Sequence, residues 1–157
     1  MSTSAIARIG VPSLFVFIVL AAAAASFGVN FQPGDWYEHL AKPAWNPPNT
    51  IFAPVWSVLY LMIAIAGWRV WRATARCVVP LLIWMAQLLL NAVWSFLFFG
   101  IHRMDIALVD IGLLLVSIVA FIVTARRYSK AASWLFVPYA LWVSFATALN
   151  FTLWRLN

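Results

Sequence analysis

Long apolar runs separated by short polar segments dominate this chain. The runs cover residues 9–27, 51–71, 78–100, 105–125 and 133–154. Each reaches the ~20 residues that a helix needs to cross the hydrocarbon core of a bilayer. The runs are continuous and do not alternate with a period of two over ~10 residues, which argues against membrane-spanning strands. We therefore predict an all-α integral membrane protein, a bundle of five transmembrane helices forming a single domain over residues 1–157.

The first apolar run has a second interpretation as a secretory signal peptide. Arg8 precedes it, and Ala21 to Ala25 would be its small-residue end. The run is long enough to span a bilayer, however, and the rest of the chain is just as hydrophobic. We interpret it as the first span, in which small residues let another helix approach closely.

Residues 28–50 break the apolar pattern and form the longest connection. The segment contains several polar residues together with Pro33, Gly34, Pro43, Pro47 and Pro48. Prolines and glycines in such number are typical of turns and loops. We predict a structured loop that connects the first two helices and caps the bundle.

Composition supports a membrane environment. The chain is 66% hydrophobic and 9% charged, with a mean hydropathy of +0.96, whereas soluble domains are ~25% charged. The formal net charge is +6, but the cations lie between apolar blocks and form no nucleic-acid-binding patch. The only cysteine, Cys77, is interpreted as a small apolar residue at a helix start.

The cations also predict an orientation. The N-terminus and the links after the second and fourth helices carry seven of them: Arg8, Arg69, Arg72, Arg76, Arg126, Arg127 and Lys130. The opposite side carries three: Lys42, Arg103 and Arg155. The positive-inside rule places the N-terminus inside and, with five spans, the long loop and the C-terminus outside. We expect a bacterial cell membrane, with an outer membrane as the open alternative.

Polar side chains within the predicted spans are the first sign of a site. Gln87, Asn91 and Ser95 are spaced by four residues and share one face of the third helix. Asp110 is ionisable and lies inside the fourth helix, where such residues tend to face protein or a cavity. Two interpretations stay open for Gln87, Asn91 and Asp110: a ligand site, or hydrogen bonds that hold helices together.

Several of the ten tryptophans lie too deep for an interfacial aromatic belt. In the predicted orientation, residues of the second, third and fourth helices lie in the outer half of the bilayer: Trp56, Asn91, Trp94, Ser95 and Asp110. On the fifth helix, Trp142 lies near mid-depth, with Ala146 and Asn150 above it. They would lie directly beneath the proline-rich loop. A mostly apolar and aromatic site with a few polar groups suits a flat hydrophobic ligand.

The loop carries the most specific motif. Residues 36–48 read WYEHLAKPAWNPP, which resembles the WYxxLxKPxWxPP loop of the tryptophan-rich sensory protein and translocator protein family, also called the peripheral-type benzodiazepine receptors. Further matches follow in family order over nearly the whole chain: Pro54-Val55-Trp56 with Leu59-Tyr60, Gln87-Leu88 with Asn91 and Trp94, Val137-Pro138-Tyr139 with Trp142, Ala146-Thr147 with Leu149-Asn150, and Trp154-Arg155.

The resemblance implies a five-helix bundle, commonly a homodimer, that binds porphyrins such as protoporphyrin IX, haem and synthetic benzodiazepine-site drugs under the first loop. The tetrapyrrole is then a ligand, and no cofactor is required. Carried over by position, the resemblance implies a pocket lined by nine residues: Trp36, Tyr37, Pro47, Trp56, Asn91, Trp94, Ser95, Trp142 and Ala146.

Two features depart from the family's ligand chemistry. The family's sterol-recognition element has Leu or Val, then Tyr, then Lys or Arg, and Leu149, Phe151 and Arg155 occupy these places. The central hydroxyl is absent, which weakens the case for cholesterol binding. His39 and His102 lie near the predicted membrane surfaces without a partner at ligand spacing, so we predict no haem ligation and no metal site.

Three functions are compatible with these features. The first is a sensor, regulator or carrier that binds tetrapyrroles, with rings stacked on tryptophans and propionates held by Lys42 or Asn46 of the loop. The second, implied by the resemblance, is a light-dependent porphyrin-degrading enzyme with pocket tryptophans as the reacting partners. Conventional catalysis is not expected, because the sequence has no hydrolytic triad, Walker loop or dinucleotide fingerprint. The third is passive transport of sterol or porphyrin.

Overall fold

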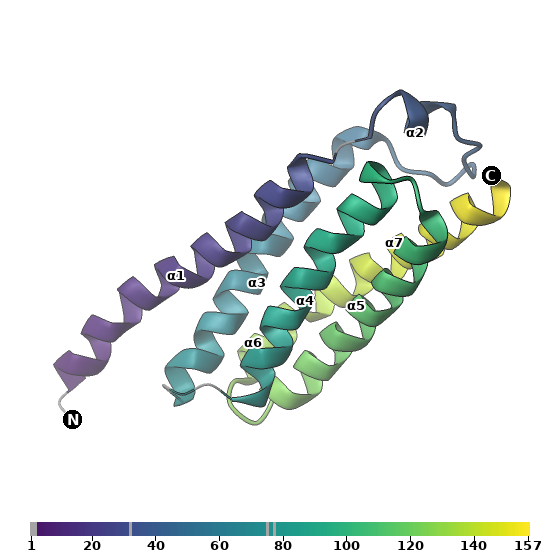
Figure 1. The fold of residues 1–157 in the computed structure, drawn as a ribbon. Helices are drawn as coiled ribbons and strands as arrows, with labels where there is room; N and C mark the ends of the chain where they lie inside the picture. Colours follow the sequence, from purple (N-terminus) through teal and green to yellow (C-terminus); the bar gives the residue numbers. More distant parts are fainter. Residues whose placement is uncertain (1–2, 32, 75, 77) are drawn as a thin grey trace.

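A computed structural model describes residues 3–31, 33–74, 76 and 78–157, with side chains from residue 12 onward in those ranges. Cys77 lies outside the described residues. Within this described part, five apolar helical segments are long enough to cross a bilayer. They run side by side in one elongated bundle, and the two ends of the chain lie at opposite ends of it (Figure 1).

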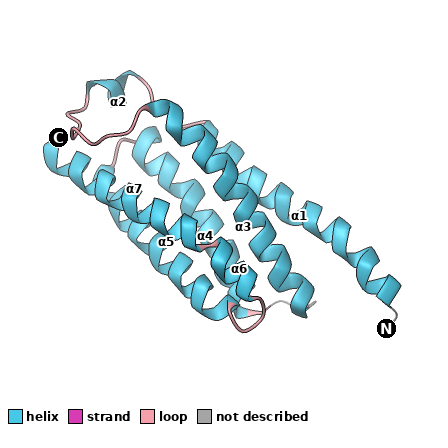
Figure 2. Ribbon diagram, turned by 180° about the vertical axis from the view of Figure 1, so that it is seen from behind, coloured by secondary structure: helices cyan, strands magenta, loops and turns pink. Residues whose placement is uncertain are grey.

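The elements follow one another as the hydropathy pattern predicts, with additional short ones. In chain order they are α1 (Thr3–Val29), α2 (Asp35–His39), the 3-10 turn η1 (Asn49–Ile51), α3 (Phe52–Thr74), α4 (Val79–Ser95), the π-helical turn η2 (Phe96–Gly100), α5 (Met104–Ala125), α6 (Lys130–Leu135) and α7 (Val137–Leu156). Seen from behind, the described chain consists of helices and loops (Figure 2). The predicted all-α bundle is confirmed, and a helix satisfies its own backbone polar groups in lipid.

Helix α5 packs against α4 and α7, α1 packs against α3 and α4, and α3 packs against α6. The buried face of α5 shows why these helices associate. Its fully buried apolar residues recur every three or four positions and form one stripe: Ala107, Ile111, Leu114, Ile118, Phe121 and Ala125. The opposite face of α5 carries exposed valines, which suits a helix that contacts lipid there.

Helices α3 and α4 approach each other closely at Gly67. The indole of Trp84 is 1% exposed and lies against this glycine. Its Nε1–H donates to the backbone carbonyl of Ile63 at 2.8 Å. The absence of a side chain at Gly67 therefore lets Trp84 reach the backbone of the neighbouring helix.

The structure corrects the predicted last helix, 133–154, at its start and in its continuity. Helical structure begins at Lys130, and the Ser129 hydroxyl caps it by accepting the Ala132 N–H at 3.2 Å. The helix is then interrupted at Phe136, between α6 and α7. Pro138 is in the first turn of α7, where its missing N–H is harmless, but it cannot continue a helix from the preceding turn.

The predicted third helix, 78–100, also changes near its end. It is α-helical up to Ser95 and then widens, so that the Ile101 N–H donates to the Phe96 carbonyl at 3.0 Å. This spacing of five residues defines a π-helical turn, a feature found frequently at functional sites. His102 follows with a φ of 58°, and this left-handed residue turns the chain into α5.

The first loop is shorter than the predicted 28–50, because α1 continues to Val29. The loop contains the short helix α2, and the turn η1 connects the loop to α3. The loop covers the end of the bundle where the C-terminus also lies (Figure 1). The prediction of a structured capping loop therefore agrees with the observed backbone.

Candidate functional site

A cavity of about 750 Å³ lies in the half of the bundle nearer the first loop. Helices α1, α3, α4, α5 and α7, the turn η2 and the loop all contribute to its wall. The volume is within the ~300–1,000 Å³ that is typical of small-molecule sites. Helices distant in sequence therefore enclose one space large enough for a ligand.

Most residues that the resemblance assigns to a pocket line this cavity. They are Tyr37, Trp56, Asn91, Trp94, Ser95, Trp142 and Ala146. Trp36 and Pro47 are not part of its wall. Trp36 stacks instead on His102, with ring centroids 4.0 Å apart and an interplanar angle of 14°. The Pro47 carbonyl accepts a hydrogen bond from the Asn46 amide within the loop.

The sterol-element positions do not act together. Leu149 lines the cavity, whereas Phe151 and Arg155 are exposed on the outside of α7. These residues lie two and six positions after Leu149, so they point to other sides of a helix with 3.6 residues per turn. Of the three residues of the element, only Leu149 is therefore part of the cavity wall.

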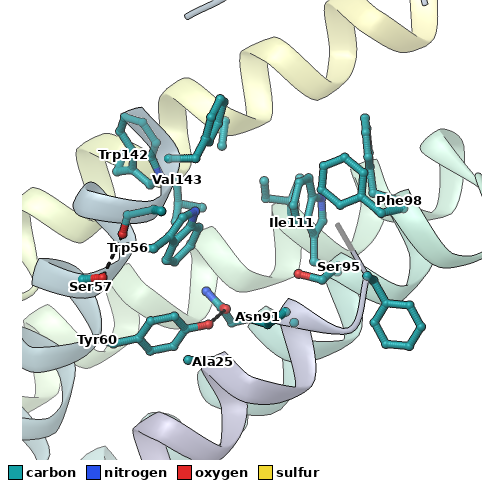
Figure 3. A pocket seen from close by; sticks show the side chains of 18 of the residues that line it. Ala25, Trp56, Ser57, Tyr60, Asn91, Ser95, Phe98, Ile111, Trp142 and Val143 are labelled. Carbon is teal, nitrogen blue, oxygen red and sulfur yellow. Dashed lines mark hydrogen bonds between the residues drawn. The ribbon is translucent and has the colours of Figure 1, made fainter. Parts of the chain in front are cut away.

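Aromatic rings on two sides define the shape of the cavity. Trp56 and Trp142 lie on one side, and Ser95 and Phe98 lie across from them (Figure 3). The Trp94 and Phe98 rings are stacked, with centroids 5.1 Å apart. Flat apolar walls of this kind offer stacking surfaces to a planar ligand.

A chain of hydrogen bonds holds the polar wall in place. The Tyr60 hydroxyl donates to Asn91 Oδ1 at 2.5 Å (Figure 3). Asn91 Nδ2 donates to the Tyr139 hydroxyl at 2.9 Å, and that hydroxyl donates to Gln87 Oε1 at 3.0 Å. Gln87 is fully buried behind the cavity wall, and its Nε2 donates to the Trp84 carbonyl at 2.9 Å. Gln87 thus links α4 to α7, which agrees with the interpretation that it holds helices together. Asn91 also links these helices, and in addition it faces the cavity.

A second polar link joins α4, α7 and α5 at the loop end of the cavity. Trp94 Nε1–H donates to Asn150 Oδ1 at 3.1 Å, and Asn150 Nδ2 donates to the Met104 carbonyl at 3.0 Å. Asn150 is 1% exposed, so both bonds are made away from solvent. These bonds fix the ring plane of Trp94 and so the shape of this wall.

Two buried polar atoms in the described part of the chain have no hydrogen-bond partner. They are Nε1 of Trp142 and Oδ2 of Asp110. Trp142 is a cavity residue, whereas Asp110 is buried in α5 and does not line the cavity. A buried polar group without a hydrogen-bond partner costs about 1–3 kcal/mol.

The loop covers the cavity through Tyr37, which is 3% exposed. Its hydroxyl donates to Asn46 Oδ1 at 3.2 Å, and the Lys42 ammonium lies 4.8 Å from its ring centroid. Burial raises the pKa of the Tyr37 phenol, and the hydrogen bond with Asn46 opposes part of that increase. The phenol therefore stays protonated at neutral pH and remains a donor.

Lys42 and Asn46, which the sequence suggests as donors to propionates, are not part of the cavity wall. Lys42 Nζ donates to the Glu38 and Leu40 carbonyls at 2.9 and 3.3 Å. Asn46 pairs with Tyr37. The loop uses these polar groups to hold its own conformation, which the motif alone does not reveal.

Helix α1 contributes to the cavity in a way that sequence reasoning missed. Ala21, Ala25 and Gly28 line the wall at spacings of four and three residues. Tyr60, one turn after Trp56, was also recognised only as part of a motif. In both helices these residues are three or four positions apart, a spacing that indicates that they share one face of the helix.

The cavity also reaches the outer surface of the bundle. Exposed residues of α1 and α3 form part of its wall: Ile18, Ala22, Ala53, Ser57 and Leu61. These two helices are neighbours. The cavity therefore opens sideways between α1 and α3.

The comparisons with known proteins agree with this architecture. The family model of the TspO/MBR family matches residues 14–155. The translocator protein of Homo sapiens is 41% identical over 139 residues, which are 83% of this chain and 81% of that protein. The tryptophan-rich protein TspO of Chlorobaculum tepidum is 40% identical over 153 residues, 92% of this chain and 94% of that protein. The tryptophan-rich sensory protein of Cereibacter sphaeroides is 36% identical over 141 residues, 90% of this chain and 89% of that protein. Matches of this strength over nearly the whole bundle show that the chain belongs to the TspO/MBR family of membrane proteins.

Proposed function

We propose that this protein binds tetrapyrroles such as protoporphyrin IX or haem, and other flat hydrophobic ligands, in the cavity beneath the first loop. It acts as a sensor, regulator or carrier of such ligands. The observation that carries the proposal is the cavity itself, about 750 Å³ in volume and lined by Trp56, Trp94 and Trp142 from three helices. Planar aromatic ligands gain both burial and stacking in such a space.

The polar groups of the cavity suggest how a ligand is oriented. Ser95 carries a hydroxyl on the wall opposite Trp56 and Trp142 (Figure 3). Asn91 has its carbonyl oxygen and its amide nitrogen engaged by Tyr60 and Tyr139. Ser95 would therefore meet a polar atom of the ligand, while Asn91 keeps the wall rigid.

We also propose an orientation in the membrane. Seven cations lie at the end of the bundle away from the first loop or on the N-terminal segment, and three lie at the loop end. The positive-inside rule then places the cavity in the outer half of a bacterial cell membrane. In this orientation the cavity opens between α1 and α3 to the outer leaflet.

A dark titration tests the proposal. Protoporphyrin IX added to the purified protein should bind saturably and shift the porphyrin absorption band. The double variant Trp56→Phe/Trp142→Phe should bind about tenfold more weakly, because two aromatic contacts of ~0.5–1.5 kcal/mol each are reduced. The matched control Trp134→Phe/Trp154→Phe removes two exposed tryptophans and should bind like the unchanged protein. Equal affinities in both double variants would contradict the proposal.

Light-dependent porphyrin degradation is a second candidate function, favoured by the presence of Trp56 and Trp142 in the cavity wall. The same samples separate it from simple binding. If the protein is an enzyme of this kind, illumination should consume bound protoporphyrin IX faster than free pigment, and the cavity double variant should lose this advantage. Loss no faster than that of free pigment would leave binding as the function.

A further inference from the structure

The charged residues of this chain are segregated along the bundle. All four carboxylates lie in the first loop or in the first half of α5: Asp35, Glu38, Asp105 and Asp110. The other end of the bundle carries only cations. We call it the basic end and define it by six described residues: Arg69, Arg72, Arg76, Arg126, Arg127 and Lys130.

The fold brings these cations together from two distant segments. Arg69, Arg72 and Arg76 belong to the end of α3 and the residues after it. Arg126 and Arg127 belong to the turn between α5 and α6, and Lys130 begins α6. Helices α3 and α6 pack against each other. Arg69 Nε donates to the Ser129 hydroxyl at 3.4 Å, which ties the two segments directly.

The guanidinium groups are positioned without any carboxylate. The Arg72 guanidinium lies 5.0 Å from the centroid of the Trp68 ring, in cation–π geometry. All six cations of the basic end are exposed. Among the described residues, the ion pair that the structure contains is Arg103 with Asp105, at the opposite end of α5.

Only some of these six cations lie where they can compensate the dipole of a helix. Arg72 is in the last turn of α3 and Arg126 follows α5, so each can compensate the carbonyl end of a helix. The like charges of the six cations are not neutralised by any carboxylate at this end, because all four carboxylates of the sequence lie elsewhere. An anionic partner that approaches this end would relieve the repulsion and gain several charge-assisted hydrogen bonds.

The position of the basic end indicates the chemistry of that partner. It lies where five hydrophobic helices leave the bilayer, and Trp68, Trp71 and Trp134 lie beside it in the sequence, typical of the headgroup level. Anions at that level are lipid headgroups, and the planar fork of arginine matches a phosphate group. We propose that the basic end binds the phosphate of anionic phospholipids and so holds a layer of them around α3 and α6.

Lipid competition measures this preference. The protein is placed in vesicles of brominated phosphatidylcholine, which quenches tryptophan fluorescence, and unbrominated phosphatidylglycerol or phosphatidylcholine is added in increasing proportion. Phosphatidylglycerol should restore fluorescence at a lower fraction than phosphatidylcholine, with about fivefold or greater preference, since each cation near the surface favours anionic lipid. The triple variant Arg69→Gln/Arg72→Gln/Lys130→Gln should lose most of this preference.

The opposite end offers a matched control with the same change of charge. Lys42→Gln/Arg103→Gln/Arg155→Gln should keep the preference, and so should the charge-conserving variant Arg69→Lys/Arg72→Lys. Circular dichroism verifies that each variant is folded, and the charge-conserving variant carries the test if the glutamine variant unfolds.

Excess inorganic phosphate at matched ionic strength should not displace the lipid. No preference in the unchanged protein, equal loss in both triple variants, loss of preference in the charge-conserving variant, or displacement by phosphate would overturn the proposal.

Discussion

Replacing Ala146 with phenylalanine is expected to weaken binding of protoporphyrin IX at least tenfold while leaving the bundle folded. Ala146 lines the cavity one helical turn after Trp142. A phenyl ring at this position would occupy space that the ligand needs. A tenfold loss corresponds to ~1.4 kcal/mol of binding free energy. The dark titration of porphyrin absorption measures it.

Ala148 supplies the control for this substitution. It lies on the same helix two residues later, but it is exposed and is not part of the cavity wall. Ala148→Phe adds the same ring on the lipid-facing side and should leave porphyrin affinity unchanged. Similar affinities for Ala146→Phe and the unchanged protein would mean that the porphyrin binds elsewhere.

Replacing Gly67 with alanine is expected to lower the free energy of unfolding by ~1–3 kcal/mol, the usual cost of overpacking a core. The new Cβ would lie 2.6 Å from Trp84 Cε2 and 2.8 Å from Phe17 Cδ1, both far inside normal contact distance. Trp84 cannot move away easily, because its Nε1–H is bonded to the Ile63 carbonyl at 2.8 Å. Unfolding by SDS in mixed micelles measures the change.

Gly112 is the matched control, since a Cβ added there would meet nothing within 4 Å. Gly112→Ala in α5 should leave stability unchanged or raise it by up to ~1 kcal/mol, because glycine disfavours a helix interior. A loss of stability in Gly112→Ala as large as that in Gly67→Ala would show that the close α3–α4 contact is not responsible.

Much of the bundle could be predicted from the sequence, because hydropathy is a strong local signal. A run of apolar residues in lipid forms a helix because a helix pairs the backbone N–H and C=O groups within the segment. Counting residues along helices whose direction comes from the positive-inside rule predicts a similar depth for Trp56, Asn91 and Trp142. Their common place in the wall of one cavity is what that counting predicts.

The irregular elements could not be predicted in the same way. The π-helical turn η2 lies within a continuous apolar run, so hydropathy does not reveal it. The interruption at Phe136 had a local signal in Pro138, which hydropathy does not register. The role of Gln87 was open because its partner, the Tyr139 hydroxyl, is 52 residues away in the chain. Lone polar residues in a span indicate that a partner exists, without indicating which one.

The loop residues show a different limit. The motif of residues 36–48 is specific enough to indicate the family, but it does not reveal which of its side chains face inward. Tyr37 covers the cavity, whereas the neighbouring Trp36 stacks on His102. Consecutive residues of the short helix α2 point in different directions, and only the packed structure determines which one covers the site.

A structure of the protein with protoporphyrin IX bound would test the central claim most directly. The account predicts the macrocycle inside the cavity, within the ~4 Å contact distance of Trp56 and Trp142. A macrocycle on the outer surface of the bundle, with the cavity still empty, would contradict the account.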